Sequence, residues 1–363
     1  MAISRRELLI GGVAAAAVAA GGYAWLNSGS SGTLNLLAWS GYEEPDFLKP
    51  FEDISGVKVN VRTYANPDEM VSILSASPDA FDVVVVDPEY IPILAGRGAI
   101  DAMDYAGFDL SSYFPYFKDL ALTKVDGKHF AVPIRFGVNS LVFNSDVIAT
   151  TDVGSYAVLN SPKAKGRIGI WDWYLPNMGV ISRSLGHAEP YNLSAEQFNN
   201  LKQALARLRP QVASIHASLP ELVSALADKR IDLAPGVGEF VAAAAKGKGN
   251  PSINWAVPEE GGIMWVETLA ICSKSQKKAD AQAFIKWVTT PPAQALLAER
   301  KAYNSNTPNM QAYPLMSANQ RKLLNAETAA QTEQLIAKLS VRTLPSQQSP
   351  QEWQEVWRNF KAT

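Results

Sequence analysis

Short apolar runs of strand length and longer amphipathic stretches alternate along the chain from Thr33 onward. The first three strands are predicted over Leu34–Trp39, Lys58–Tyr64 and Phe81–Asp87. The last of these includes four consecutive valines and is apolar on both faces, as expected of a strand that helices cover on both sides. Before it, Asn66 is followed by proline at the first helical position, which is typical of a helix start. The alternation predicts an α/β protein with largely parallel sheets.

The same pattern continues to the C-terminus. Ser194 opens a helix with a capping box, because Gln197 follows three residues later. Further strands are predicted over Phe130–Gly137, Ser140–Phe143 and Arg167–Trp173. Further helices are predicted over Glu221–Lys229, Glu239–Lys246, Ala279–Val288 and Ala293–Lys301, and the final helix carries Trp353, Trp357 and Phe360 on one face.

The N-terminus has the features of an address segment. Arg5 and Arg6 precede the apolar run Leu8–Leu26, which resembles a bacterial twin-arginine export signal. Because the run approaches the ~20 residues that span a bilayer, anchoring by an uncleaved signal stays an alternative. Its many alanines and glycines make it weakly apolar and favour export. Residues 1–32 are therefore interpreted as an export signal and linker.

Composition narrows the class of protein. A chain of 363 residues favours two domains, and 33 basic against 35 acidic residues indicate no nucleic-acid partner. Cys272 is the single cysteine, which excludes an intrachain disulfide and a cysteine-cluster metal site. His129, His187 and His216 are far apart in sequence, and common motifs for hydrolases, zinc proteases and nucleotide binding are absent. We therefore expect no enzyme, no metal and no cofactor.

One segment points to a binding site. In "PEEGGIMWVETLAI", residues 258–271, strand alternation turns Trp265 and Glu267 to the same side. An unpaired buried carboxylate is costly, so an acid beside a large ring indicates a site for a cation. Asp87 and Glu89 follow the third strand, and ligands of open α/β sheets gather beyond the carboxyl ends of strands.

Several segments together resemble a known family. They are "LLAWSGYEEPDFLKPFED", "GVKVNVRTY", "FDVVVVDPEY", "FAVPIRFGVNSLVFN", "KGRIGIWD" and "PEEGGIMWVETLAI". Their order and spacing are similar to those of the bacterial spermidine/putrescine-binding proteins, the periplasmic components of polyamine ABC importers. The last segment is the most specific, because the family has G-G-I-x-W-x-D/E-S/T-L-A-I there.

The resemblance implies a two-lobed periplasmic binding protein fold of type II, with mostly parallel central sheets flanked by helices and a ligand cleft between the lobes. It implies a first lobe of residues 33–141 with 266–313 and a second of 142–265 with 314–363. It also implies a periplasmic monomer that binds a small cationic ligand, a polyamine or related amine, and delivers it to a membrane permease. Aromatic rings hold the ligand's methylene chain and carboxylates hold its ammonium groups.

Carried over by position, Trp39 and Tyr42 match the family's aromatic pair after the first strand, and Trp265 and Glu267 match its aromatic residue and amine-binding acid. Other positions depart from the family. Asp87 and Glu89 replace a serine and a tyrosine, whereas Trp173 and Pro176 stand where the family has two acids. Asp172 is a neighbouring acid that could compensate. The family's tryptophan near 236–238 is missing, and Glu239 is an acid on that loop.

Arg135 leaves the ligand class open. Facing the ligand, it would bind a carboxylate and favour an amino acid, an opine-like compound or another zwitterion. Otherwise it pairs with Asp87 or Glu89, or faces solvent, and this reading is favoured because paired and surface arginines are commoner. A ferric-ion receptor lacks its adjacent tyrosine pair here, and a secreted enzyme has no motif to support it. The ligand-binding prediction contains Trp39, Tyr42, Asp87, Glu89, Arg135, Trp173, Trp265 and Glu267.

Overall fold

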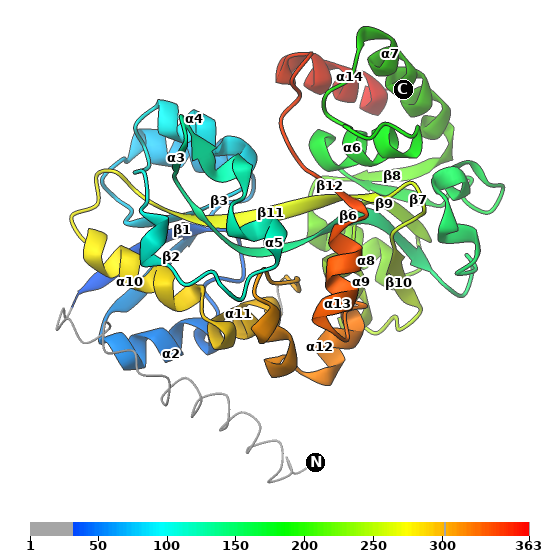
Figure 1. Cartoon of the computed structure of the whole chain (residues 1–363). Helices are drawn as coiled ribbons and strands as arrows, with labels where there is room; N and C mark the ends of the chain where they lie inside the picture. The colour runs from blue at the N-terminus through cyan, green and yellow to red at the C-terminus, as the bar shows by residue number, and fades with distance from the viewer. Residues whose placement is uncertain (1–31, 301–302, 363) are drawn as a thin grey trace. The chain divides into compact units, whose positions relative to one another are not determined.

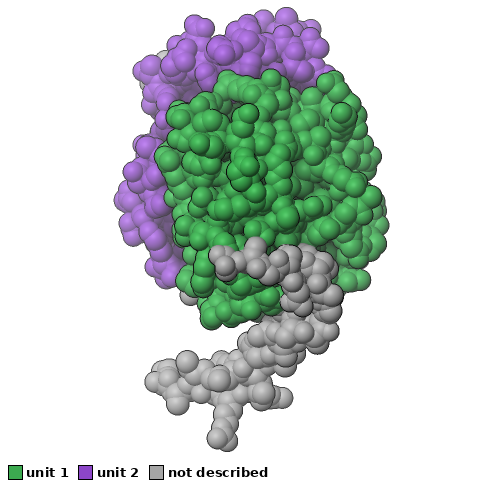
Figure 2. Space-filling model, turned by 90° about the vertical axis from the view of Figure 1, so that its left-hand side faces the viewer, with its two compact units in different colours: residues 1–136, 266–329 green, residues 137–265, 330–363 purple. Residues whose placement is uncertain are grey.

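The computed structural model describes residues 32–300 and 303–362. Its chain divides into two compact units (Figure 2). Unit 1 runs to Phe136 and resumes at Val266–Ala329, and unit 2 comprises Gly137–Trp265 and the chain from Ala330. The lobe prediction has the same order of segments but places two of its three boundaries elsewhere, at 141/142 and 313/314. Two of the observed divisions fall inside continuous strands, where the pattern of apolar residues does not change.

Unit 1 contains a sheet in the order β2-β1-β3-β11. Strand β1 pairs in parallel with β2 and β3, whereas β11 pairs antiparallel with β3. Figure 1 shows α3 and α4 on one face of this sheet and α2 and α10 on the other. The elements are β1 (Thr33–Ala38), α2 (Pro45–Ser55), β2 (Lys58–Thr63), α3 (Pro67–Ala76), β3 (Val83–Val86), α4 (Ile91–Gly96), α5 (Pro115–Lys118), β4 (Lys124–Val125), β5 (Lys128–His129), α10 (Lys278–Val288), α11 (Pro291–Ala298) and α12 (Ala318–Leu323).

Unit 2 contains β9, β7 and β8 in parallel, with β6 antiparallel to β9 and β10 antiparallel to β6. Helices α6, α7 and α14 cover one face, and α8 and α9 cover the other (Figure 1). The elements are β7 (Ile168–Trp171), α6 (Tyr174–Ser184), α7 (Ala195–Leu208), β8 (Val212–His216), α8 (Leu219–Ala227), β9 (Leu233–Val237), α9 (Glu239–Gly247), β10 (Ile253–Ala256), β12 (Leu339–Val341) and α14 (Pro350–Ala362).

Three elements contain a division between the units. These are β6 (Val132–Asn144), β11 (Gly262–Ile271) and α13 (Ala329–Ile336). The separate strands predicted on either side of Gly137 are one strand, β6, and every one of its 13 residues is buried. Glycine at this position does not interrupt the strand, because its missing side chain leaves room for neighbours from unit 2.

Local sequence signals account for several element boundaries. The Asn66 side chain accepts a hydrogen bond from the Glu69 backbone N–H at 2.9 Å and caps α3. Ser194 and Gln197 form the predicted capping box at the start of α7. The four valines of β3 are fully buried, and the strand ends where Asp87 begins the next turn. These predictions are confirmed because they depend on residues close together in sequence.

Aromatic residues of the last helix complete the core of unit 2. Trp353, Trp357 and Phe360 of α14 are buried, as their spacing predicts. The Trp353 ring stacks on Phe198 of α7, with ring centroids 5.6 Å apart. The C-terminal segment is therefore an integral part of unit 2.

The predicted export signal lies outside the described residues. Within the two described ranges, none of the helices combines the length and apolar character needed to cross a bilayer.

Candidate functional site

Arg135, Tyr42 and Glu267 form a buried charged cluster in unit 1. Arg135 comes from β6, Glu267 from β11 and Tyr42 from the turn after β1. Arg135 Nε donates to Glu267 Oε2 at 2.7 Å, and Nη2 donates to Oε1 at 3.1 Å. The Tyr42 hydroxyl also donates to Glu267 Oε2, at 2.6 Å. The predicted amine-binding acid thus lies in an ion pair with an arginine of the same unit.

The three side chains of this cluster are almost completely buried, and burial affects the pKa of two of them. The exposed fractions are 1% for Arg135, 4% for Glu267 and 0% for Tyr42. Burial alone would lower the pKa of Arg135, but the charge of Glu267 and the phenol of Tyr42 raise it above the ordinary value. Burial also raises the pKa of Tyr42, which keeps its hydroxyl protonated as a donor. The solvent-facing alternative for Arg135 is therefore wrong, and its bidentate partner is Glu267 and not Asp87 or Glu89.

A second cluster in unit 1 joins Trp39, Tyr64 and Asp87. The Trp39 indole N–H donates to Asp87 Oδ1 at 3.2 Å, and its ring lies against Tyr64 with centroids 4.7 Å apart. Asp87 and Glu89 are 3% and 5% exposed. Glu89 lies in the short 3-10 helix η2 (Pro88–Tyr90), directly after β3. The structure therefore brings together half-buried Trp39 and a buried carboxylate, as a site for an organic cation requires.

In unit 2, Trp265 lies beside a buried acid. A Cβ atom added to Gly137 would lie 1.9 Å from Glu239 Oε1 and 2.3 Å from Trp265 Cζ2, so both side chains approach the same backbone position. Both Glu239 carboxylate oxygens accept from the Val138 N–H at 3.1 Å. The Phe240 ring packs edge-on against Trp265. Trp265 thus shares a buried environment with a carboxyl group of its own unit.

The carboxyl group of Glu239 has a raised pKa. It is 1% exposed at the first turn of α9. Burial raises the pKa of its carboxyl group to about 8, although hydrogen bonds from its own backbone N–H and from Val138 lower it. At neutral pH this carboxyl is therefore mainly protonated, and a neighbouring cation would favour its ionisation.

Trp173 lies under a guanidinium group. It is the N-cap residue of α6, half-buried, and Arg342 Cζ lies 4.5 Å from its ring centroid. Asp172, next to it, accepts from Trp357 Nε1 at 2.8 Å and Lys361 Nζ at 2.7 Å. Asp172 therefore holds α14 in place, and the compensating role considered for it has no support in these contacts. The predicted strand over Arg167–Trp173 ends at Trp171, which puts Trp173 in the turn before α6.

Sequence reasoning did not assign Tyr303, Arg342 or Glu239 to the site. Tyr303 and Arg342 lie in irregular segments without a periodic pattern, and only their contacts reveal them. The sequence around Glu239 could have indicated its place, because Glu239 begins helix α9 directly after β9 and the N-cap residue Gly238. The apolar residues that follow Glu239 indicate a buried helix start, so this acid could have been added to the predicted site.

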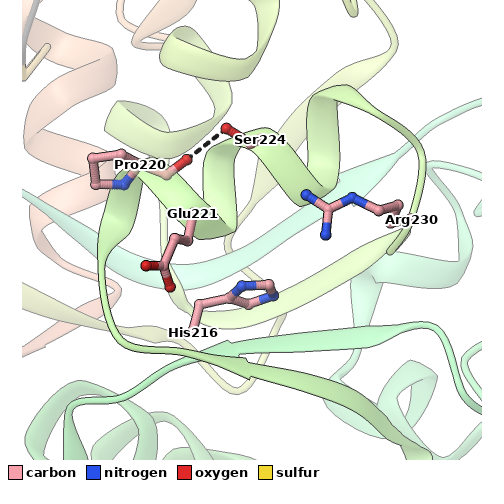
Figure 3. Close-up of a pocket in the computed structure, with 5 residues that line it drawn as sticks. All are labelled: His216, Pro220, Glu221, Ser224 and Arg230. Atoms are coloured by element: carbon pink, nitrogen blue, oxygen red, sulfur yellow. Dashed lines mark hydrogen bonds between the residues drawn. The ribbon is translucent and has the colours of Figure 1, made fainter.

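A surface hollow of about 450 Å³ lies elsewhere in unit 2. Figure 3 shows His216 at the end of β8 and Glu221 of α8, with Arg230 beyond that helix. The other lining residues are Pro220 and Ser224, and none belongs to the predicted site. His216 shares a hydrogen bond with Ser214, and burial lowers the pKa of its imidazole.

The other two histidines lie elsewhere and contact different groups. His129 stacks on Tyr105, and His187 lies beside Ser182. In the described ranges, no three His, Cys, Asp or Glu side chains gather as metal ligands.

Comparison with known proteins agrees with this architecture. A curated relative, the spermidine/putrescine-binding periplasmic protein of Escherichia coli (strain K12), is 28% identical over 333 residues, covering 89% of this chain and 90% of the relative. The spermidine/putrescine substrate-binding protein PotD of Streptococcus pneumoniae superposes with a TM-score of 0.76 at 18% identity, covering 92% of this chain and 99% of that structure. The protein MotA of A. tumefaciens, in complex with glucopine, has a TM-score of 0.70 at 14% identity, covering 91% and 99% of the two chains.

These likenesses confirm the resemblance and the periplasmic binding protein fold predicted from the sequence. The family model for bacterial extracellular solute-binding proteins matches residues 46–323, which is more than half of the chain. The description of this family names the binding of solutes. The chain therefore belongs to the bacterial extracellular solute-binding proteins.

Proposed function

We propose that this protein binds a polyamine or a related small cationic amine in the periplasm and delivers it, as a monomer, to the permease of an ABC importer. Membership of the solute-binding family supports a transport role, and the name of the Escherichia coli relative supports the ligand class. The twin-arginine segment at residues 1–32 is the proposed route of export, with an uncleaved anchor as the alternative.

The observation that supports an amine as the ligand is the arrangement of side chains around Asp87. Its carboxylate is buried beside the Trp39 ring, and Glu89 follows two residues later. An ammonium group placed there gains cation–π attraction of about 0.5–2 kcal/mol from the ring. The carboxylates replace the hydration that the ammonium loses, through charge-assisted hydrogen bonds.

We propose Trp39, Asp87 and Glu89 as the ligand contacts of unit 1, with Tyr42, Arg135 and Glu267 as the wall next to them. In unit 2 we propose Trp173 and Trp265, together with Glu239, whose carboxyl group lies in the same surroundings as Trp265. Each group is open to test by substitution in its own unit.

The first experiment is mass spectrometry of ligand retained by the purified protein, followed by thermal-shift measurements with 1,4-diaminobutane, spermidine and monoamines. A ligand at a hundred times its Kd should add about 2.7 kcal/mol to the free energy of unfolding. Asp87→Asn should remove most of this effect, whereas Asp53→Asn on the surface of α2 should keep it. Equal stabilisation of both variants would contradict the proposal.

A second ligand class has one observation in its favour. Arg342 is 3% exposed and lies over Trp173, which is one of the predicted ligand-binding rings. A buried guanidinium there suits the carboxylate of an amino acid or another zwitterion. Turnover of an amine without a bound complex would instead indicate a secreted enzyme.

A further inference from the structure

Three side chains of unit 1 surround the Arg135 guanidinium as a cation-binding box. Its Cζ atom lies 4.7 Å from the Tyr42 ring centroid and 5.2 Å from that of Tyr303. Glu267 supplies a bidentate carboxylate at the third side. Two aromatic faces and a carboxylate are what an organic ammonium group requires of a protein. We call Tyr42, Tyr303 and Glu267 the cation box.

Arg135 already occupies the cation box. Arg135 uses Nε and Nη2 on Glu267, and its Nη1 donates to the Tyr303 carbonyl at 3.2 Å. Glu267 Oε1 accepts from Arg135, and Oε2 accepts from both Arg135 and Tyr42. The pair carries no net charge and is buried. A ligand ammonium group therefore finds neither an unused oxygen nor a negative charge in the box.

In unit 2, another arginine of the protein lies over a predicted ligand-binding ring. The guanidinium of Arg342 lies over the ring of Trp173, with Cζ 4.5 Å from the centroid. One predicted aromatic face in each unit is thus covered by an arginine of the protein itself.

Two further buried acids of unit 1 lie in one turn. Asp87 and Glu89 are two residues apart, and the turn that holds them is closed by the Tyr90 N–H, which donates to the Asp87 carbonyl at 2.9 Å. In unit 2, burial raises the pKa of Glu239 to about 8, so its carboxyl group is mainly neutral at pH 7. Because Asp87 and Glu89 lie in one turn, we take them together as the contact for a single ammonium group.

We propose that Arg135 is a specificity residue, whose guanidinium occupies the cation box in place of a ligand ammonium group and so favours amines with one positive end over diamines. This inference rests on the proposed function, because it assumes that the ligand is a small amine. It narrows the substrate class to a monoammonium compound whose other end is neutral or anionic.

Three compounds with the same four-carbon chain test this inference by calorimetry at pH 7. They are 1,4-diaminobutane, n-butylamine and 4-aminobutanoate, which differ only in their second end. The wild-type protein should bind at least one monoammonium compound about tenfold more tightly than the diamine, or better, a difference that calorimetry resolves easily. Tighter or equal binding of 1,4-diaminobutane overturns the inference and leaves the proposed function standing. Absence of binding by these compounds and by spermidine overturns both.

Two variants separate the roles of charge and space. Arg135→Met keeps an apolar stem, opens the cation box and leaves the Glu267 charge for a ligand, so the preference for monoammonium compounds should shrink by about tenfold or more. The double variant Arg135→Met/Glu267→Gln opens the same space without the charge and should show no gain in diamine affinity. Unchanged selectivity in Arg135→Met overturns the inference. Should that variant not fold, the wild-type comparison decides alone, and the double variant, with no unpaired charge, serves as the folded control.

Discussion

Arg135 and Glu267 lie 132 residues apart in sequence and form a bidentate ion pair, with Nε 2.7 Å from Oε2 and Nη2 3.1 Å from Oε1. Both side chains are almost fully buried. The desolvation of two such charges offsets much of their attraction, so the pair adds little stability by itself. Removal of one partner is different, because the other charge then remains buried without compensation.

Substitution of Glu267 should therefore destabilise the protein as well as change its binding. Glu267→Gln leaves Arg135 charged, and we expect the free energy of unfolding to fall by about 3–5 kcal/mol. Urea denaturation measures this change. The double variant Arg135→Met/Glu267→Gln should recover most of the loss. Asp53→Asn, which breaks the exposed pair with Lys49, should change stability very little and serves as the control. Equal loss in the single and double variants would show that the ion pair is not the cause.

The sequence placed Glu267 among the ligand-binding residues, and the structure adds a partner within the protein. Strand alternation placed Trp265 and Glu267 on β11, and both are buried. Alternation is a local property, so it could be read from the chain. The partner of Glu267 could not, because the contact with Arg135 joins two strands far apart in sequence. The sequence analysis named Asp87 or Glu89 as the partner of Arg135 instead.

Other contacts in the fold also differ in whether the sequence predicts them. The cap at Asn66 and the aromatic face of α14 depend on residues within a few positions of one another, and both were predicted correctly. The hydrogen bond from Trp357 to Asp172 and the position of Arg342 over Trp173 depend on how the C-terminal segment packs in unit 2. Such contacts between distant segments carry no sequence period, so Asp172 remained a site candidate and Arg342 was missed.

Asp172 should contribute to stability through α14. It accepts hydrogen bonds from Trp357 and Lys361, so Asp172→Ala removes the acceptor of both donors. We expect a loss of about 1–3 kcal/mol, because the Trp357 indole N–H is left without this partner in a largely buried position. Chemical denaturation followed by tryptophan fluorescence measures the loss. Lys361→Met should cost much less, since the Lys361 side chain is one-third exposed. A larger effect of Lys361→Met than of Asp172→Ala would contradict this account.

Glu239 should make stability depend on pH. Burial raises the pKa of its carboxyl group to about 8 in the folded protein, against about 4.3 for an unperturbed glutamate. Between these values the folded state binds more protons than the unfolded state, so this contribution to stability falls as pH rises and is flat above the folded pKa. The expected slope is about −1.4 kcal/mol per pH unit.

The slope is isolated by comparing the wild type with Glu239→Gln in urea unfolding at pH 5, 6, 7 and 8. All other titrating groups are shared, so the difference in unfolding free energy between the two proteins should change steadily over this window. Glutamine resembles the protonated carboxyl, and the variant should therefore gain in relative stability at the alkaline end. A difference that is constant from pH 5 to 8 would mean that the Glu239 pKa is not raised.

Gly137 should be intolerant of any side chain. Its Cβ would lie 1.9 Å from Glu239 Oε1 and 2.3 Å from Trp265 Cζ2, far closer than van der Waals contact. Because both neighbours are buried and packed, Gly137→Ala forces them to move, and we expect a loss of about 1–3 kcal/mol, as for overpacked cores. The Trp265 emission spectrum should shift at the same time, because its surroundings change. Both effects report on unit 2.

Gly247 provides the matched control for Gly137. It is the last residue of α9, the helix that begins with Glu239, and an added Cβ would have no heavy atom within 4 Å. Gly247→Ala should therefore keep or slightly raise stability, since alanine is the better helix former by about 1 kcal/mol in a helix interior. Both substitutions add one methyl group to the same unit, so a difference between them measures the packing at Gly137. If Gly137→Ala unfolds at the same urea concentration as Gly247→Ala, Trp265 and Glu239 are not packed against this backbone, and the assignment of both to one buried environment fails.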